Sequence, residues 1–322
     1  MPTVIPNDHI GPGFAELVPE PLRGSDAYVD IVTWNIWYFH ERDPDRVDTV
    51  VDVLEGLNAD IIVLQEIREG ALDVVAQKLS ERGAGNYDVA YGATGGQQRV
   101  AMMYDLDWIR AKDDLVELFG KGEVVGAASG KDAFPRLPLW GYFTALPVTE
   151  NEDPFDFQLV GLHLKSKRGG GDDQRLAAGN ALAYWMENNA SRTDADVIMM
   201  GDWNNTPGAD DWAALRDMEG RGEMLFTQIN DPSDFSYLYY RNKSNLGTRI
   251  DLAAISVASA DELVSPPDAV RWIGLDDFLE GNPKASEIKD YFARLKKGVS
   301  DHLPVVTRFT FAQSDDVAPL MT

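Results

Sequence analysis

The sequence predicts an α/β fold in which two packed sheets lie between layers of helices. Apolar runs of strand length recur along the chain, amphipathic helices separate some of them, and most predicted neighbours are close in sequence. The 322 residues have room for two small domains, but sandwiches of this length often fold as one unit. We expect one domain over residues 27–312, between an irregular arm at 1–26 and an acidic tail at 313–322.

The first predicted elements are a strand, a helix and a second strand. Residues 29–34 (VDIVTW) predict the first strand, and residues 60–66 (DIIVLQE) predict the second. Between them, Asp43 is a suitable N-cap, with Pro44 at the first helical position. One helical face then carries the apolar residues Val47, Val50, Val51, Leu54 and Leu57.

The rest of the domain alternates strands with helices. We expect a helix at 71–80 and another from about Asp173, after the three glycines at 169–171. Further strands are predicted at 87–91, 99–104, 139–146, 155–164, 197–201, 249–256 and 303–311. The long stretches at 206–248 and 257–299 are expected to hold mainly loops and short helices that decorate the core.

The composition indicates a soluble globular protein. Hydrophobic residues make up 44% of the chain, and no apolar run approaches the roughly 20 residues needed to cross a bilayer. The first residues are rich in proline and lack the regions of a signal peptide, which predicts a cytoplasmic protein if the chain is complete and a secreted one if a leader has been removed. The absence of cysteine excludes disulfides and thiolate metal sites, and four histidines make a zinc site improbable. Any metal must be held mainly by oxygen.

The net charge limits the kind of partner. Asp and Glu number 53 against 29 Lys and Arg, which gives −24. Such a surface repels nucleic acid, so we expect no stable nucleic-acid complex. The negative charge is a weaker argument against an enzyme that contacts a polyanion only locally and through a metal ion. The charge is also consistent with solubility in a saline habitat.

Several predicted strands end in polar side chains where a loop ordinarily supplies Gly or Ser. These residues are Asn35, Glu66, His163, Asp202 with Asn204, and Asp251, while Asp301 and His302 directly precede the last strand. Burying several carboxylates together requires a compensating cation or mutual hydrogen bonds. The oxygen-bearing members of this set suit Mg²⁺ or Mn²⁺.

Each of these residues also has a purely structural interpretation. Asn35 and Asp202 are possible turn residues, Glu66 is a possible partner of Arg68, and Asp301 with His302 is a possible N-cap pair. Their combined order in the sequence favours a functional site.

That order resembles the endonuclease/exonuclease/phosphatase superfamily, which includes pancreatic-type deoxyribonucleases, abasic-site endonucleases, inositol polyphosphate phosphatases and bacterial sphingomyelinases. The resemblance runs from about residue 30 to residue 311 and rests on five motifs in order: IVTWN, VLQE, GLHLKSK, GDWN and SDHLP. It implies a four-layer sandwich of two packed mixed, mainly antiparallel sheets flanked by helices.

The resemblance also implies a role for each motif residue. Glu66 would be the principal metal ligand, assisted by Asn35 and Asp301. Asp202 would orient or deprotonate the attacking water, and Asn204 would hold that water or a phosphate oxygen. His302, kept in one tautomer by Asp251, would stabilise the transition state, and His163 would contact a non-bridging oxygen. These residue types suit metal-assisted phosphate ester hydrolysis.

Basic residues near these motifs are candidates for binding the substrate. Arg136 matches an arginine that many nuclease members place against a substrate phosphate. Lys165, Lys167 and Arg168 follow His163 and form a local basic lip, in the style of secreted bacterial nucleases. Gln98 stands where some nucleases carry a Glu that supports the central His, so we expect His163 to be a neutral hydrogen-bond donor.

The sequence therefore predicts a Mg²⁺- or Mn²⁺-dependent phosphodiesterase, with nucleic acid as the leading substrate. The acidity favours the alternative of a phosphomonoesterase or a phospholipid or small-molecule phosphodiesterase. Residues 235–240 (FSYLYY) resemble the membrane-binding hairpin of sphingomyelinases, but we read them as the strand before Asp251. Intact candidates for every role argue against a non-catalytic binding module. The aromatic residues Trp34, Trp37, Tyr38 and Phe39 are candidates for lining the site, but we expect them to pack in the core.

Overall fold

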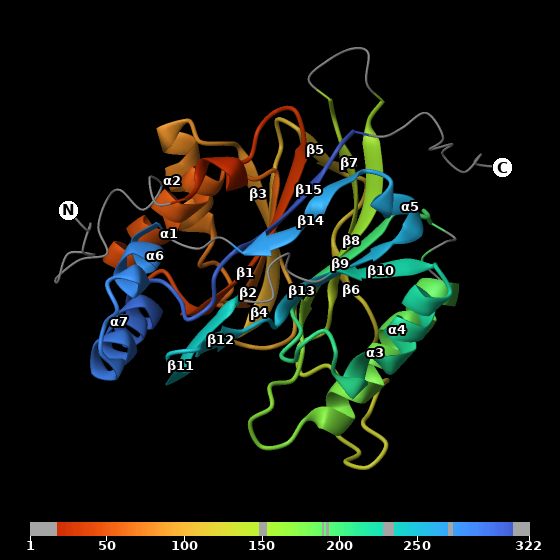
Figure 1. Ribbon diagram of the computed structural model, residues 1–322. Coiled ribbons are helices and arrows are strands. Elements are labelled where there is room, and N and C mark those ends of the chain that lie inside the picture. The colour runs from red at the N-terminus through yellow and green to blue at the C-terminus, as the bar shows by residue number, and fades with distance from the viewer. Residues whose placement is uncertain are drawn as a thin grey trace.

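Two large sheets packed face to face form the centre of the molecule (Figure 1). The computed structural model describes residues 18–147, 153–188, 190, 193–227, 235–269 and 273–311. Helices cover the outer faces of both sheets, so the predicted four-layer α/β sandwich is confirmed.

The first sheet has six strands in the order β14-β15-β1-β2-β4-β3. Its strands are β1 (Val29–Phe39), β2 (Ile61–Ile67), β3 (Tyr87–Tyr91), β4 (Arg99–Asp105), β14 (Leu263–Ala269) and β15 (Val305–Phe309). β1 is parallel to β2 and antiparallel to β15. The remaining neighbours pair antiparallel.

The second sheet follows the order β10-β13-β9-β8-β7-β5, with β6 also paired to β7. Its strands are β5 (Ile109–Ala111), β6 (Val116–Glu117), β7 (Leu139–Ala145), β8 (Phe155–His163), β9 (Val197–Asp202), β10 (Met224–Thr227) and β13 (Asp251–Ser256). β8 and β9 are parallel, and the other pairs are antiparallel. Both sheets are therefore mixed and mainly antiparallel.

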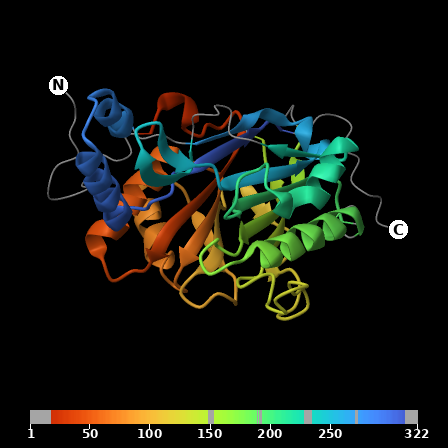
Figure 2. The same cartoon turned by 60° about the horizontal axis from the view of Figure 1, so that its bottom comes forward.

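The helices form the two outer layers (Figure 2). α1 (Pro44–Leu57), α2 (Asp73–Arg82), α6 (Ile273–Glu280) and α7 (Ala285–Gly298) lie on the side of the first sheet, and α3 (Asp172–Asn188) and α4 (Ala213–Gly220) lie on the side of the second. Three short helices complete the described part of the fold: the 3₁₀ helices η2 (Glu20–Leu22) and η4 (Asp210–Trp212), and the single-turn α-helix α5 (Val257–Ala260). α1 begins as predicted, because the Asp43 side chain accepts a hydrogen bond from the Arg46 amide and Pro44 follows.

Buried apolar side chains form three clusters that match these layers. One cluster lies between α1, α2, α7 and the first sheet, and a second lies between α3, α4 and the second sheet. The third lies between the sheets, where residues such as Val63, Met102 and Leu159 meet. All five apolar residues predicted for one face of α1 are buried.

The expectation of mainly loops and short helices at 206–248 and 257–299 is wrong. These stretches contain β10, β14 and the 14-residue helix α7, besides β11 (Tyr237–Asn242) and β12 (Asn245–Thr248), which pair as a separate two-stranded sheet. β10 and β14 lie at sheet edges, and β11 and β12 are only half-buried. β10, β12 and β14 have no long apolar run, so the sequence pattern did not mark them, whereas the run at 235–240 did predict a strand where β11 lies.

The predicted domain limits stay a prediction. Residues 1–17 of the expected arm and the expected tail at 313–322 lie outside the described residues. Within the described chain, no helix has the length and apolar character required to pass through a bilayer.

Candidate active site

The predicted site residues gather at one end of the sandwich, where strands from both sheets end side by side. In the second sheet, Asp202 is the register partner of His163 on one side and of Asp251 on the other. β1 and β2 of the first sheet contact β9 across the interface between the sheets. The parallel pairs β1–β2 and β8–β9 thus bring four strand ends to one place.

β1 does not end at Asn35 as predicted but continues through a bulge to Phe39. Trp37 and Tyr38 both have positive φ values, of 37° and 49°, which are uncommon for residues other than glycine. The Asn35 side-chain oxygen accepts a hydrogen bond from the Trp37 amide at 3.0 Å. The Tyr38 amide in turn donates to Glu66 Oε2 at 3.1 Å. The bulge therefore ties two predicted metal ligands, Asn35 and Glu66, to one turn.

Asp202 is buried and accepts hydrogen bonds from two asparagines. Asn35 Nδ2 donates to Oδ2 at 3.1 Å and Asn204 Nδ2 donates to the same oxygen at 2.9 Å, while the Asn204 amide donates to Oδ1 at 2.8 Å. Burial and the charge of Asp251 raise the pKa of Asp202 to about 7, against the lowering effects of His302 and both asparagines. This carboxyl is therefore close to the pKa expected of a group that exchanges a proton near neutral pH.

His302 and Asp251 form a buried pair beside Asp202. His302 Nδ1 lies 2.8 Å from Asp251 Oδ2, as the predicted role of Asp251 requires. Burial lowers the pKa of His302, but the charge and hydrogen bond of Asp251, together with Asp202 and Asp301, outweigh burial and raise it to about 10. His302 therefore carries a positive charge, and its Nε2 remains as a donor toward a substrate.

His163 is buried between the two acidic groups of the site. Its Nε2 lies 3.6 Å from Asp202 Oδ2 and 3.9 Å from Glu66 Oε1. Burial and the positive charges of Arg136 and His302 hold the pKa of His163 well below its usual value, although an interaction with the Gln98 backbone opposes them. His163 is thus neutral, in agreement with the expectation drawn from Gln98.

The segment that carries Asp301 and His302 is held by buried hydrogen bonds. Ser300 Oγ donates to the Asn35 carbonyl at 2.6 Å and accepts from the His302 amide at 3.0 Å. Trp34 Nε1 donates to the His302 carbonyl at 2.9 Å. Asp301 forms a short ion pair with Lys296 of α7. Helix packing, strand pairing and side-chain hydrogen bonds thus meet at this segment.

The four predicted substrate-binding residues take different positions. Arg136 Nη2 donates to the Leu164 carbonyl at 3.1 Å, the carbonyl to which Asn204 Nδ2 also donates. Burial lowers the pKa of Arg136, while the charges of Asp202 and Glu66 raise it, so this cation lies close to the acidic centre. Lys165 Nζ turns back onto its own loop and donates to the Arg168 carbonyl at 3.0 Å. Lys167 and Arg168 are exposed.

Other side chains near the site were missed or misassigned by sequence reasoning. Tyr237 of β11 is half-buried, and its ring lies 4.8 Å from that of His302. Ser236 Oγ accepts hydrogen bonds from the Ile250 and Asp251 amides. The run FSYLYY did predict a strand, but only pairing of Tyr237 with His302 places this strand over the site.

The structure bears differently on the structural interpretations that the sequence allowed for single residues. Arg68 lies 3.5 Å from Glu41 and so gives no support to a pair with Glu66. Trp34 and Phe39 are fully buried, as expected for core residues. Tyr38 is 46% exposed and Trp37 is half-buried, so for these two the expectation of core packing is wrong. The bulge turns them toward the surface.

The donors present fit a hard divalent cation. Asp202, Asp251 and His302 offer ligand atoms within 4.8 Å of one another, and Asp251 Oδ1 is buried without a hydrogen-bond partner in the described chain. The His302–Asp251 hydrogen bond and the charge on His302, however, occupy two members of that group. Glu66, Asn35 and Asp301 also offer oxygens, the ligand type that Mg²⁺ and Mn²⁺ prefer, although the Asn35 oxygen accepts from the Trp37 amide and Asp301 pairs with Lys296.

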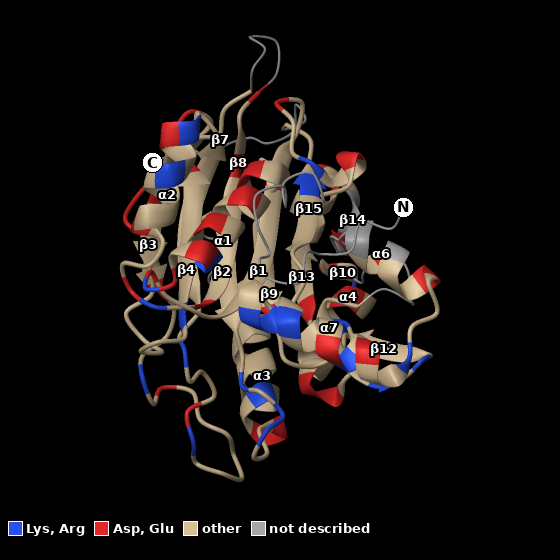
Figure 3. Cartoon of the chain, turned by 90° about the vertical axis from the view of Figure 1, so that its left-hand side faces the viewer, with Lys and Arg blue, Asp and Glu red and all other residues tan. Residues whose placement is uncertain are grey.

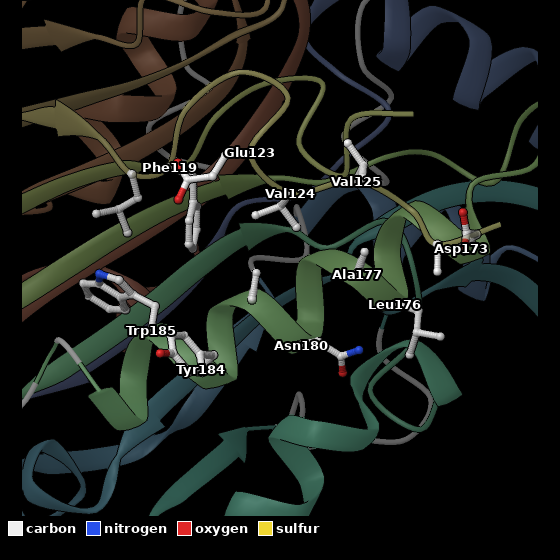
Figure 4. A pocket seen from close by; sticks show the side chains of 13 residues that line it. Phe119, Glu123, Val124, Val125, Asp173, Leu176, Ala177, Asn180, Tyr184 and Trp185 are labelled. Carbon is white, nitrogen blue, oxygen red and sulfur yellow. The ribbon is translucent and has the colours of Figure 1, made fainter. Parts of the chain in front are cut away.

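A separate cavity of about 870 Å³ lies between the loop at 118–127 and the outer face of α3 (Figure 4). Its lining is mainly apolar and includes Phe119, Val125, Leu176 and Trp185. None of the predicted site residues lines it.

Comparison with known proteins agrees with the fold and the motifs. The sequence profile of the Endonuclease/Exonuclease/phosphatase family matches residues 32–302. Curated protein sequences gave no match.

Solved structures show the same fold at low sequence identity. An endonuclease/exonuclease/phosphatase from Bacteroides vulgatus is 14% identical with a TM-score of 0.60, covering 88% of this chain and 99% of that one. The human Nocturnin catalytic domain with a bound sulfate anion is 15% identical with a TM-score of 0.56, covering 90% and 95%. Truncated Caenorhabditis elegans TDP2 is 17% identical with a TM-score of 0.54, covering 91% and 100%. The chain belongs to the endonuclease/exonuclease/phosphatase family of phosphoesterase hydrolases.

Proposed function

We propose that this protein is a divalent-metal-dependent phosphodiesterase that cleaves nucleic acid. The observation that carries the proposal is the buried cluster in which Asp202 is held by Asn35 and Asn204 and flanked by the His302–Asp251 pair. These groups supply a proton acceptor and a cationic donor within one small volume. That combination suits hydrolysis of a phosphate ester.

The protonation state of each side chain sets its proposed role in the reaction. Asp202, with its pKa raised to about 7, accepts a proton from the attacking water on a carboxylate oxygen. Charged His302 donates from Nε2 to the oxygen on which negative charge develops, because Asp251 occupies Nδ1. Neutral His163 and the Arg136 guanidinium bind non-bridging oxygens. Bound by Glu66, Asn35 and Asp301, Mg²⁺ or Mn²⁺ would neutralise phosphate charge.

Nucleic acid is favoured as the substrate by the position of exposed cations. Lys167 and Arg168 lie on the loop that directly follows His163, so they can reach phosphates beside the scissile one. A small phosphomonoester or diester offers no such flanking phosphates. The net charge of −24 favours that small-substrate alternative, since it weakens long-range attraction of a polyanion.

Metal removal and a substrate panel test this proposal. EDTA should abolish turnover and Mg²⁺ or Mn²⁺ should restore it, on a panel of plasmid DNA, RNA, bis-p-nitrophenyl phosphate, p-nitrophenyl phosphate and sphingomyelin. Glu66→Gln should remove most activity while thermal unfolding shows a folded protein. Full activity in excess chelator would sink the metal-dependent mechanism, and hydrolysis of small esters without cleavage of DNA or RNA would rule out the nuclease assignment.

A further inference from the structure

Basic residues mark the last turn of α7 (Figure 3), and one of them, Lys296, contacts Asp301 of the candidate site. Lys296 Nζ forms a short ion pair with Asp301 and lies 4.7 Å from the centre of the Trp37 ring. Its side chain is 36% exposed, whereas that of Asp301 is 9% exposed. Lys296 therefore carries its charge at the boundary between a buried site carboxylate and solvent.

The contact between Lys296 and Trp37 is built into the backbone on both sides. Buried Arg46 donates through Nη2 to the carbonyls of Trp37 at 2.8 Å and Val299 at 2.9 Å. It thereby joins the β1 bulge to the C-terminal end of α7. The consecutive positive φ values of Trp37 and Tyr38 persist because such contacts hold them, and backbone strain of this kind concentrates at functional sites.

The helix itself is fixed, so Lys296 does not depend on a mobile surface element. One face of α7 is buried through Ile288, Tyr291, Phe292 and Leu295, in the apolar cluster that also contains Leu238 of β11. The neighbouring Lys297 is exposed on the same turn. The two lysines thus have the same charge and almost the same position along the chain, but only Lys296 turns toward the site.

A cation held by Asp301 would repel the ammonium group that now pairs with that carboxylate. Lys296 would then need another anion, and a substrate supplies phosphates at this place. A lysine ammonium is a compact charge on a flexible stem with three donors, which suits phosphate oxygens. The face of the Trp37 ring would hold the Lys296 ammonium group by a cation–π interaction, within reach of those phosphates.

We propose that Lys296, seated on Trp37, binds a substrate phosphate next to the scissile one. Lys296 belongs to the layer outside the first sheet, whereas Lys167 and Arg168 follow β8 of the second sheet. A chain bound by both sets crosses the site between the two sheets. The substrate class is therefore a phosphodiester with phosphates on both sides of the cleaved bond, an inference that rests on the proposed function.

Three variants test the proposal: Lys296→Met, the charge-keeping Lys296→Arg, and Lys297→Met as the matched control. Each is assayed with Mg²⁺ on a short fluorophore–quencher oligonucleotide and on bis-p-nitrophenyl phosphate. Lys296→Met should raise KM for the oligonucleotide by about fivefold to tenfold and flatten the slope of log(kcat/KM) against log[salt] by about 0.7 to 0.9. Lys296→Arg should retain most of the wild-type slope, and Lys297→Met should stay within about twofold of wild type on both substrates.

A calorimetric Mg²⁺ titration separates substrate binding from a merely structural role. Removing a cation beside Asp301 should leave Mg²⁺ affinity unchanged or stronger, and melting temperatures should show that all variants fold. Equal behaviour of Lys296→Met and Lys297→Met would overturn the inference alone. So would a loss in kcat that is equal on both substrates and accompanied by weaker Mg²⁺ binding, because that pattern means that Lys296 only positions Asp301. A wild-type protein inactive on both substrates would overturn the proposed function and this inference together.

Discussion

Asp202 is the residue at which burial, charge and hydrogen bonding act together most directly. Its pKa of about 7 results from burial and from Asp251, partly offset by His302 and two asparagines. A carboxyl in this state accepts a proton near neutral pH, which an exposed aspartate does far less effectively. The role follows from the surroundings of the side chain, since G-D-x-N fixes only its place in the sequence.

Asp202→Asn keeps the volume of the side chain and removes the base. We expect kcat to fall by about 10² or more, with little change in KM, because the loss lies in the chemical step. Steady-state kinetics on bis-p-nitrophenyl phosphate measure both constants. A loss confined to KM would assign Asp202 to substrate binding instead.

Asp60 gives the fold a pH dependence that is unrelated to catalysis. Burial and the nearby Asp30, Asp105 and Asp26 raise its pKa to about 7, against a hydrogen bond of 2.7 Å from the Asp30 amide. The folded protein therefore holds this proton up to about pH 7, whereas the unfolded chain releases it near pH 4. The contribution of Asp60 to stability is present below pH 4 and is lost as pH rises through 7.

Asp60→Asn removes this titration and keeps an oxygen that can accept from Asp30. The melting temperature of the variant relative to wild type should therefore be higher at pH 8 than at pH 4.5. Asp217→Asn, which removes an exposed carboxylate, is the control and should show no such change. If the melting temperatures of Asp60→Asn and wild type differ by the same amount at pH 4.5 and pH 8, the raised pKa of Asp60 is contradicted.

Among the elements, β9 shows why the site motif begins with glycine. Gly201 has a φ of 151°, and a Cβ there would lie 2.1 Å from the Leu162 carbonyl oxygen of β8. The close approach of these two parallel strands sets His163 beside Asp202. Only glycine permits it.

Gly201→Ala should lower the free energy of unfolding by about 2 kcal/mol or more, because the added methyl group collides with backbone that cannot move aside. Chemical denaturation measures this loss. Gly208→Ala is the matched control, since its Cβ would meet nothing within 4 Å, and it should change stability by less than about 0.5 kcal/mol. Equal effects of the two substitutions would show that the β8–β9 contact tolerates separation.

For the whole molecule, an acidic surface and a small basic lip would have opposite effects on the binding of the proposed nucleic-acid substrate. The net charge of −24 repels nucleic acid at a distance, but salt at about 0.15 M screens that repulsion beyond about 8 Å. Under the proposed function, direct contacts from the exposed Lys167 and Arg168 would act inside that range. Binding should therefore be local and short-lived.

The double variant Lys167→Ala with Arg168→Ala tests this balance. Oligonucleotide cleavage should fall several-fold, and the salt dependence of kcat/KM should flatten by about 0.7 to 0.9 for each phosphate that no longer has a cationic partner. Lys78→Ala with Lys121→Ala removes two charges away from the site and is the control. Equal decreases in both double variants would mean that net charge, and not the lip, governs binding.

The local sequence determined the elements that have strong patterns. The cap at Asp43, the apolar face of α1 and the central strands were predictable, because burial on one or both faces imposes a regular spacing. The motifs also determined which residues meet, through resemblance to the family. Edge strands such as β10 and β14 escaped prediction, since their pairing depends on partners distant in sequence.

Tertiary structure alone decided the states and the surroundings of the site residues. The pKa values of Asp202 and His302 arise from burial and from each other, and neither effect exists in the unfolded chain. The bulge that exposes Tyr38, the position of Tyr237 over His302 and the pairing of Lys296 with Asp301 likewise depend on the folded backbone. A sequence specifies such contacts only through the whole fold, because free energies of packing and charge depend on distances that local patterns do not contain.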